Sequence, residues 1–82
     1  MIRNMELPSI GVKYRHYRRG TEYRVTAIGL HSETGEVLIV YEALYADPNF
    51  PYGQIWVRPA GLFLEEIEPG IRRFTPIENV KA

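Results

Sequence analysis

The chain has no cysteine among its 82 residues. A disulfide framework and a thiolate zinc site are therefore excluded, and a domain of this size must rely on its hydrophobic core. A metal site would need both histidines, His16 and His31, together with a carboxylate such as Glu33, and nothing in their spacing requires them to meet. The sequence therefore predicts neither a metal site nor a bound cofactor.

Net charge and long apolar runs are also missing. Ten Lys and Arg residues balance ten Asp and Glu residues, which argues against a histone-like nucleic-acid binder. The longest apolar run, residues 37–41, is too short to span a membrane, and the first residues lack a signal-peptide pattern. We therefore expect a cytoplasmic protein with no membrane partner. Residues 1–24 are mostly basic and residues 33–68 mostly acidic, a pattern that permits a local anion site or pairing between the two regions.

Glycine and proline, in contrast, are frequent and divide the chain into short segments rich in Val, Ile and Tyr. They stand at Gly11, Gly20, Gly35, Pro48, Pro51, Gly53, Pro59, Pro69 and Gly70. We expect a lead-in over residues 1–10, one domain over residues 11–74 and a tail over residues 75–82. The segments predict a mainly β fold, a small SH3-like barrel or roll of about five short antiparallel strands with at most one short helical turn.

The clearest strands are residues 22–30 and 36–46, joined by a loop in which Gly35 supplies a positive φ. A helix is the alternative for residues 36–46, but the β-branched and aromatic residues there favour a strand. Residues 12–18, 54–58 and 62–68 are the other extended segments, with a helical turn allowed after Pro59. From residue 72 onward we expect a frayed end, because too few residues follow the capping pattern at residues 75–78 to support a helix.

The first candidate site is the run of residues 13–19, where rings alternate with cations. An extended backbone would place Tyr14 and His16 on one face and Arg15 and Tyr17 on the other. Surfaces that stack bases and neutralise phosphates have this composition. The alternative is ordinary packing, in which the rings belong to the core and the guanidinium groups lie over them or pair with Glu65, Glu66 or Glu68.

The second candidate is the strand face that carries Trp56 and Arg58, opposite Ile55 and Val57. Tryptophan and arginine dominate binding hot spots. If Ile55 and Val57 fill the core, Trp56 lies near the surface and can meet a partner, whereas a buried Trp56 removes the site. Residues 47–53 precede this strand as a surface loop whose two rings we expect to be exposed.

The chain contains three short motifs, at residues 14–17 (Tyr-Arg-His-Tyr), 31–34 (His-Ser-Glu-Thr) and 56–59 (Trp-Val-Arg-Pro). They resemble motifs of a small bacterial family labelled domain of unknown function 1653. The resemblance spans residues 11–74. It implies an SH3-type barrel and brings no established activity. The loop at residues 47–54 departs from the family by its greater length. Because the motifs are rich in polar and aromatic groups, the resemblance implies a shared surface made of Tyr14, Arg15, His16, Tyr17, His31, Ser32, Glu33, Trp56 and Arg58.

These observations favour a binding module over an enzyme. Its partner would be a nucleic-acid segment or an acidic or peptide partner, and the protein itself would be a monomer or a weak homo-oligomer. One alternative is a small hydrolase or lyase in which His16 or His31 acts as base while Arg15 or Arg58 holds an anionic substrate. Ser32 adjoins His31, but neighbours on an extended chain point apart, which counts against a catalytic dyad. A third reading is a structural subunit of a larger complex.

Overall fold

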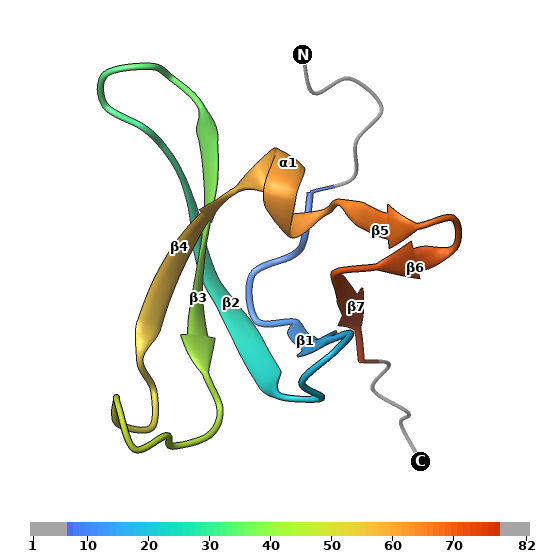
Figure 1. Cartoon of the computed structure of the whole chain (residues 1–82). Helices are drawn as coiled ribbons and strands as arrows, with labels where there is room; N and C mark the ends of the chain where they lie inside the picture. The colour runs from blue at the N-terminus through green and yellow to red at the C-terminus, as the bar shows by residue number, and fades with distance from the viewer. Residues whose placement is uncertain (1–6, 78–82) are drawn as a thin grey trace.

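The computed structural model describes residues 7–77, which form seven strands and one short helix (Figure 1). The elements in chain order are β1 (Lys13–His16), β2 (Glu22–Leu30), β3 (Val37–Ala43), β4 (Ile55–Pro59), α1 (Ala60–Phe63), β5 (Glu66–Glu68), β6 (Ile71–Arg72) and β7 (Phe74–Pro76). Five strands form one antiparallel sheet in the order β4-β3-β2-β1-β7, and β5 and β6 form a separate hairpin.

The sheet is built on the hairpin of β2 and β3, as the sequence predicts. The two strands pair from Leu30 opposite Val37 to Tyr23 opposite Ala43. Gly35 has a φ of 77° and closes the loop between them. The β-branched and aromatic residues of β3 therefore form a strand, and the helical alternative is wrong.

The fold class is confirmed as a mainly β roll with one helical turn. The helical turn is α1, which follows Pro59 as expected. The main sheet does not close into a barrel, because β4 and β7 are its two edges and do not pair with each other. Five strands were predicted, and the main sheet has five. Its fifth strand is β7, whereas the strand expected over residues 62–68 is shortened to β5 and belongs to the separate hairpin.

The largest correction concerns the end of the chain. We expected a frayed end from residue 72, but β6 begins at Ile71 and β7 runs antiparallel to β1, with Phe74 opposite His16 and Pro76 opposite Tyr14. Phe74 is buried, so this strand contributes to the core as well as to the sheet. In the capping pattern at residues 75–78, Thr75 and Pro76 belong to β7 and Ile77 follows this strand. Glu78, the last residue of the pattern, lies outside the described residues.

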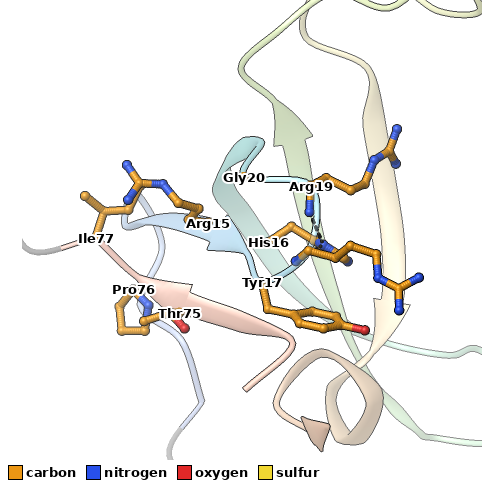
Figure 2. Close-up of a pocket in the computed structure, with 9 residues that line it drawn as sticks. Arg15, His16, Tyr17, Arg19, Gly20, Thr75, Pro76 and Ile77 are labelled. Atoms are coloured by element: carbon orange, nitrogen blue, oxygen red, sulfur yellow. Dashed lines mark hydrogen bonds between the residues drawn. The ribbon is translucent and has the colours of Figure 1, made fainter. Parts of the chain in front are cut away.

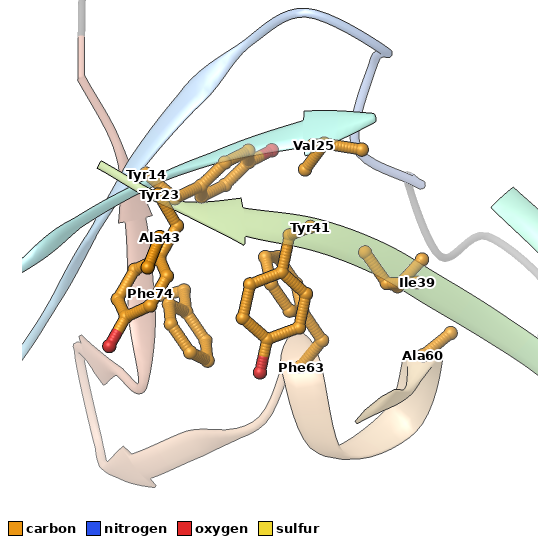
Figure 3. Close-up of a cluster of buried hydrophobic side chains, with 9 residues drawn as sticks. All are labelled: Tyr14, Tyr23, Val25, Ile39, Tyr41, Ala43, Ala60, Phe63 and Phe74. Atoms are coloured by element: carbon orange, nitrogen blue, oxygen red, sulfur yellow. The ribbon is translucent and has the colours of Figure 1, made fainter. Parts of the chain in front are cut away.

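The core lies on one face of the main sheet, between it and α1 (Figure 3). It is largely aromatic: the rings of Phe63 and Phe74 stack with centroids 4.4 Å apart, and the ring of Tyr41 meets both of them edge-on. The buried residues are Tyr14, Tyr23, Val25, Ile39, Tyr41, Ala43, Ala60, Phe63 and Phe74. Rings pack tightly in edge-on and stacked arrangements, so a few large side chains can fill the interior of so short a chain.

Candidate functional site

The turn between β1 and β2 is held by a histidine, and we call residues 16–20 the first histidine turn. His16 Nδ1 accepts hydrogen bonds from the backbone N–H groups of Arg18, at 3.2 Å, and Arg19, at 3.3 Å. The carbonyl oxygen of His16 accepts a third bond from Gly20 N–H at 3.0 Å, and Gly20 has a φ of 71°. The ring therefore satisfies backbone donors that the hairpin ladder leaves free.

The turn between β2 and β3, residues 31–35, repeats this arrangement and is the second histidine turn. His31 Nδ1 accepts from Glu33 N–H at 3.1 Å and Thr34 N–H at 3.3 Å, and Gly35 N–H donates to the His31 carbonyl at 2.8 Å. Ser32 Oγ donates to a Glu33 carboxylate oxygen at 2.6 Å. His16 and His31 thus each stabilise the backbone of a turn, a structural role that the sequence does not reveal.

The two histidine turns lie far apart, at opposite ends of β2 (Figure 1). β2 has nine residues, which at about 3.3 Å per residue span about 30 Å. His31, Ser32 and Glu33 therefore do not join the other predicted site residues. Within residues 7–77 no three His, Asp or Glu side chains come close enough to hold a metal ion.

The hydrogen bonds to Nδ1 also decide the protonation pattern of His16. A ring nitrogen that accepts N–H bonds carries no proton, so the neutral ring bears its proton on Nε2. Burial, followed by the charges of Arg19, Arg73, Arg58 and Arg18, lowers the pKa of His16. Neither nitrogen keeps a free lone pair, so the geometry does not favour the alternative in which His16 acts as a base. The bonds to His31 Nδ1 have the same consequence for its neutral form.

A cavity of about 430 Å³ lies between the first histidine turn and β7, and we call it the larger cavity (Figure 2). Figure 2 shows the ring of Tyr17 beside His16, with Thr75, Pro76 and Ile77 across from them. The residues that line it come from the turn and from the end of the described chain: Arg15, His16, Tyr17, Arg18, Arg19, Gly20, Thr75, Pro76 and Ile77. Three arginines and an exposed ring thus border one hollow.

A second cavity of about 140 Å³, the smaller cavity, lies on the core side of the sheet. It shares His16 and Arg19 with the larger cavity. Its lining is aromatic apart from these two residues and one further arginine: His16, Arg19, Tyr23, Tyr41, Tyr45, Trp56, Arg58 and Phe74. The smaller cavity therefore connects the two candidate sites of the sequence, the basic run and the Trp56 strand.

The arginines around these cavities differ in their partners. Arg15 pairs with Glu22 at 2.8 Å and Arg73 with Glu65 at 2.9 Å. Arg18, Arg19 and Arg58 have no carboxylate oxygen within 4.0 Å among residues 7–77. Within residues 7–77 the basic run therefore pairs only in part, and none of its pairs is with the acids at residues 65–68. The guanidinium carbon of Arg18 lies 5.7 Å from the centroid of the Tyr17 ring, a contact of the kind that the packing alternative also named.

Arg58 is held against rings instead of acids. Its Nε donates to the Tyr41 hydroxyl at 3.3 Å, and its guanidinium carbon lies 5.7 Å from the centroid of the Phe74 ring. Burial raises the pKa of Tyr41, and burial likewise raises the pKa of Tyr45, so neither hydroxyl ionises near neutral pH. The positive charge at this position is therefore not offset by a phenolate.

Trp56 takes a position between the two alternatives that the sequence left open. It pairs with Tyr41, and Arg58 pairs with Ile39, so both side chains are on the core face of the sheet. Because β4 is an edge strand, Trp56 keeps 38% of its surface exposed, while Ile55 and Val57 on the other face are 48% and 56% exposed. Trp56 is neither a core residue nor a fully exposed one: it forms the rim of the smaller cavity.

Other predicted positions divide between core and surface. Tyr14 is buried and meets Phe63 edge-on, so it supports the sheet and cannot contact a partner. Phe50, expected to be exposed, packs edge-on against both Tyr45 and Trp56, whereas Tyr52 of the same loop is exposed as expected.

Several residues of the cavities were missing from the predicted site, among them Arg18, Arg19 and Tyr45. Arg18 and Arg19 stand in the basic run, which was their signal. Tyr45 lies outside the three motifs and the basic run, and the fold brings it to the smaller cavity.

A comparison with protein families matches residues 12–76 to the family described as protein of unknown function (DUF1653). The chain belongs to this family. The resemblance drawn from the three motifs is thereby confirmed, and all three motifs lie within the matched range. The family description assigns no activity. Comparisons with curated proteins and with solved structures gave no match. Over residues 7–77 no helix has the length and apolar character needed to cross a bilayer.

Proposed function

We propose that this protein is a binding module for single-stranded nucleic acid. The site would be the surface formed by Arg18, Arg19 and Arg58 together with the rings of Tyr17 and Trp56, which we call the arginine surface. The observation that carries the proposal is that these three arginines lack a carboxylate partner within residues 7–77 and border two adjoining cavities. Unpaired cations attract phosphates, and exposed rings beside them stack unpaired bases.

Electrostatics support this position on an otherwise neutral chain. Arg18, Arg19, Arg58 and Arg73 all lower the pKa of His16 through their charges, so four guanidinium groups act on one point. Within the described residues, Arg73 is the one among them that is paired with an acid. A local concentration of positive charge of this kind attracts a polyanion even when the net charge of the chain is zero.

The rings favour a single strand over a duplex or an acidic peptide. Tyr17 and Trp56 each keep 38% of their surface exposed, one at each cavity. Bases must be unstacked from one another before they can stack on a side chain, and an acidic peptide offers no flat rings for such contacts. The proposal retains the expectations of a bacterial source, a cytoplasmic location, an SH3-like relationship and a monomer or weak homo-oligomer.

The experiment is a titration of a fluorescently labelled single-stranded oligonucleotide, followed by anisotropy at several salt concentrations. We expect the logarithm of affinity to fall linearly with the logarithm of salt concentration. Arg18→Gln should make this slope shallower by about 0.7, the contribution of one phosphate contact in a single strand. Arg18 is exposed and makes no ion pair within the described residues, so the fold should be unaffected.

The matched control is Arg72→Gln, because Arg72 lies on β6 and lines neither cavity. This variant should keep the wild-type slope. No binding of the oligonucleotide, or the same change of slope in both variants, would overturn the proposal. Stronger binding of a polyglutamate peptide than of the oligonucleotide would assign the arginine surface to an acidic protein partner instead.

A further inference from the structure

The smaller cavity has the dimensions of a single chemical group. Its volume of about 140 Å³ lies below the range of about 300–1,000 Å³ for sites of drug-sized molecules. This volume is large enough for a phosphate group. Phe50 packs edge-on against Tyr45 and Trp56, so two of the lining rings are braced from the loop of residues 47–53.

The two arginines and the histidine that line the smaller cavity are suited to an anion. Arg58 uses its Nε for the Tyr41 hydroxyl, and its two terminal amino groups make no hydrogen bond within residues 7–77. Arg19 likewise makes no ion pair with a carboxylate of the described chain. His16 must present Nε2–H as a donor, because its Nδ1 is occupied by two backbone N–H groups. Among residues 7–77 no acidic side chain lines the cavity.

We infer that the smaller cavity binds a terminal phosphate monoester of a nucleic-acid strand. The inference rests on the proposed function and specifies which part of the strand this cavity recognises. A terminal phosphate carries a charge of about −1.5 to −2 near pH 7 and three free oxygens, compared with one charge and two free oxygens for an internal diester. Two guanidinium groups and one ring N–H match the larger charge and the greater number of acceptors. The aromatic lining reduces the local dielectric and strengthens these contacts.

The larger cavity supplies the place for the attached nucleoside. Its volume of about 430 Å³ lies within the range of sites for drug-sized molecules. It shares His16 and Arg19 with the smaller cavity and has the ring of Tyr17 in its lining as a stacking surface.

The experiment compares oligonucleotides of one sequence that carry a 5′-phosphate, a 3′-phosphate or hydroxyl groups at both ends. Binding is read by anisotropy of an internal label and by the emission of Trp56, the single tryptophan, which lines the smaller cavity. We expect one of the phosphorylated strands to bind about tenfold more tightly than the hydroxyl strand, a difference of about 1.4 kcal/mol. The two phosphorylated arms identify which end is recognised.

Two variants test the assignment to this cavity. Arg58→Lys and Arg19→Lys keep the charge but lose the planar fork that holds phosphate oxygens in pairs, so each should abolish most of the tenfold preference. Arg72→Lys is the control and should retain it. Two variants are needed because Arg58 also contacts the core rings, whereas Arg19 lies on an exposed turn.

The outcomes separate the inference from the proposed function. Equal affinity for all three strands would overturn the inference while leaving single-strand binding in place. Retention of the preference in both the Arg58→Lys and Arg19→Lys variants would also overturn it. Absence of binding by every strand would overturn the proposed function and the inference with it.

Discussion

The two histidine turns allow a quantitative test, because they share one backbone arrangement but differ in what the ring touches. His31→Ala removes two N–H···Nδ1 hydrogen bonds from an exposed turn. Loss of a capping side chain of this kind costs about 1 kcal/mol of unfolding free energy. His16→Ala removes the same two bonds and also the edge-on contact with Phe74, whose ring centroid is 5.2 Å away. An aromatic pair contributes about 0.5–1.5 kcal/mol more, so we expect a total of about 2 kcal/mol.

Thermal unfolding followed by circular dichroism measures this difference. In a domain of 60–100 residues, 1 kcal/mol lowers Tm by about 4–8 °C. His31→Ala should therefore lower Tm by about 4–8 °C, and His16→Ala by about twice as much. Urea unfolding should give the same order of stability, with a similar m value for all variants because the exposed surface is unchanged.

Asparagine at each position separates the two contributions. Its side-chain oxygen accepts backbone N–H bonds in turns, as the histidine ring does here. His31→Asn should therefore be close to wild type, whereas His16→Asn should still lack the contact with Phe74 and lose about 1 kcal/mol. Equal losses for His16→Ala and His31→Ala, or no advantage of asparagine over alanine at position 31, would refute the reasoning.

Two further predictions concern pH and the core. Because the pKa of His16 is lowered in the folded chain, its contribution to stability is complete above the unfolded pKa of about 6.5 and is lost as the pH falls from there through the folded pKa. The urea midpoint should thus fall less between pH 7.5 and 5.5 in His16→Asn than in wild type, and an equal fall would contradict this. Phe63→Ala removes a fully buried ring and should cost about 3–5 kcal/mol, whereas Leu62→Ala at the neighbouring exposed position should change stability by less than about 0.5 kcal/mol. Thermal unfolding of the two variants checks this, and similar losses would contradict the assigned packing of α1.

Local signals in the sequence were sufficient for the centre of the sheet. The hairpin of β2 and β3 is defined by β-branched residues on each side of a loop that ends in Gly35, and all of this information lies within 22 residues of chain, Glu22–Ala43. The helical turn α1 is similarly local, because Pro59 ends β4 and is followed by small residues. Such features depend on neighbours in sequence, which is why they are predictable.

Two features depend on residues that are distant in the sequence: the formation of β7, and the face of the sheet on which the side chain of Trp56 lies. β7 is a strand only because β1, about sixty residues earlier, offers it an edge. Its own residues, Phe-Thr-Pro, contain a proline and indicate no strand by themselves. The position of Trp56 was equally undetermined, because Ile55, Trp56 and Val57 are all apolar and only the pairing with Tyr41 places Trp56 on the core face.

The sequence indicated several residues of the candidate site but not how they are arranged in space. Tyr17, Trp56 and Arg58 do border the two cavities, together with His16 and Arg15. The His-Ser-Glu-Thr motif suggested a second part of the same surface, but it lies at the other end of β2. A linear motif shows that polar residues are present and does not distinguish a ligand-binding histidine from one that accepts backbone N–H bonds.

The repeated turn also explains how the same local structure can serve different purposes. In the first histidine turn, His16 Nδ1 accepts hydrogen bonds from the backbone N–H groups of Arg18 and Arg19. The ring that stabilises the turn thus also fixes two arginines that have no carboxylate partner within residues 7–77. In the second turn, the residues held in the same way are Glu33 and Thr34, which offer no positive charge. In both turns the hydrogen bonds from backbone N–H groups to the histidine stabilise the turn. The two turns differ in the side chains that they present to solvent. Under the proposed function His16 is therefore a positioning residue, and binding by the arginine surface would depend on its arginines.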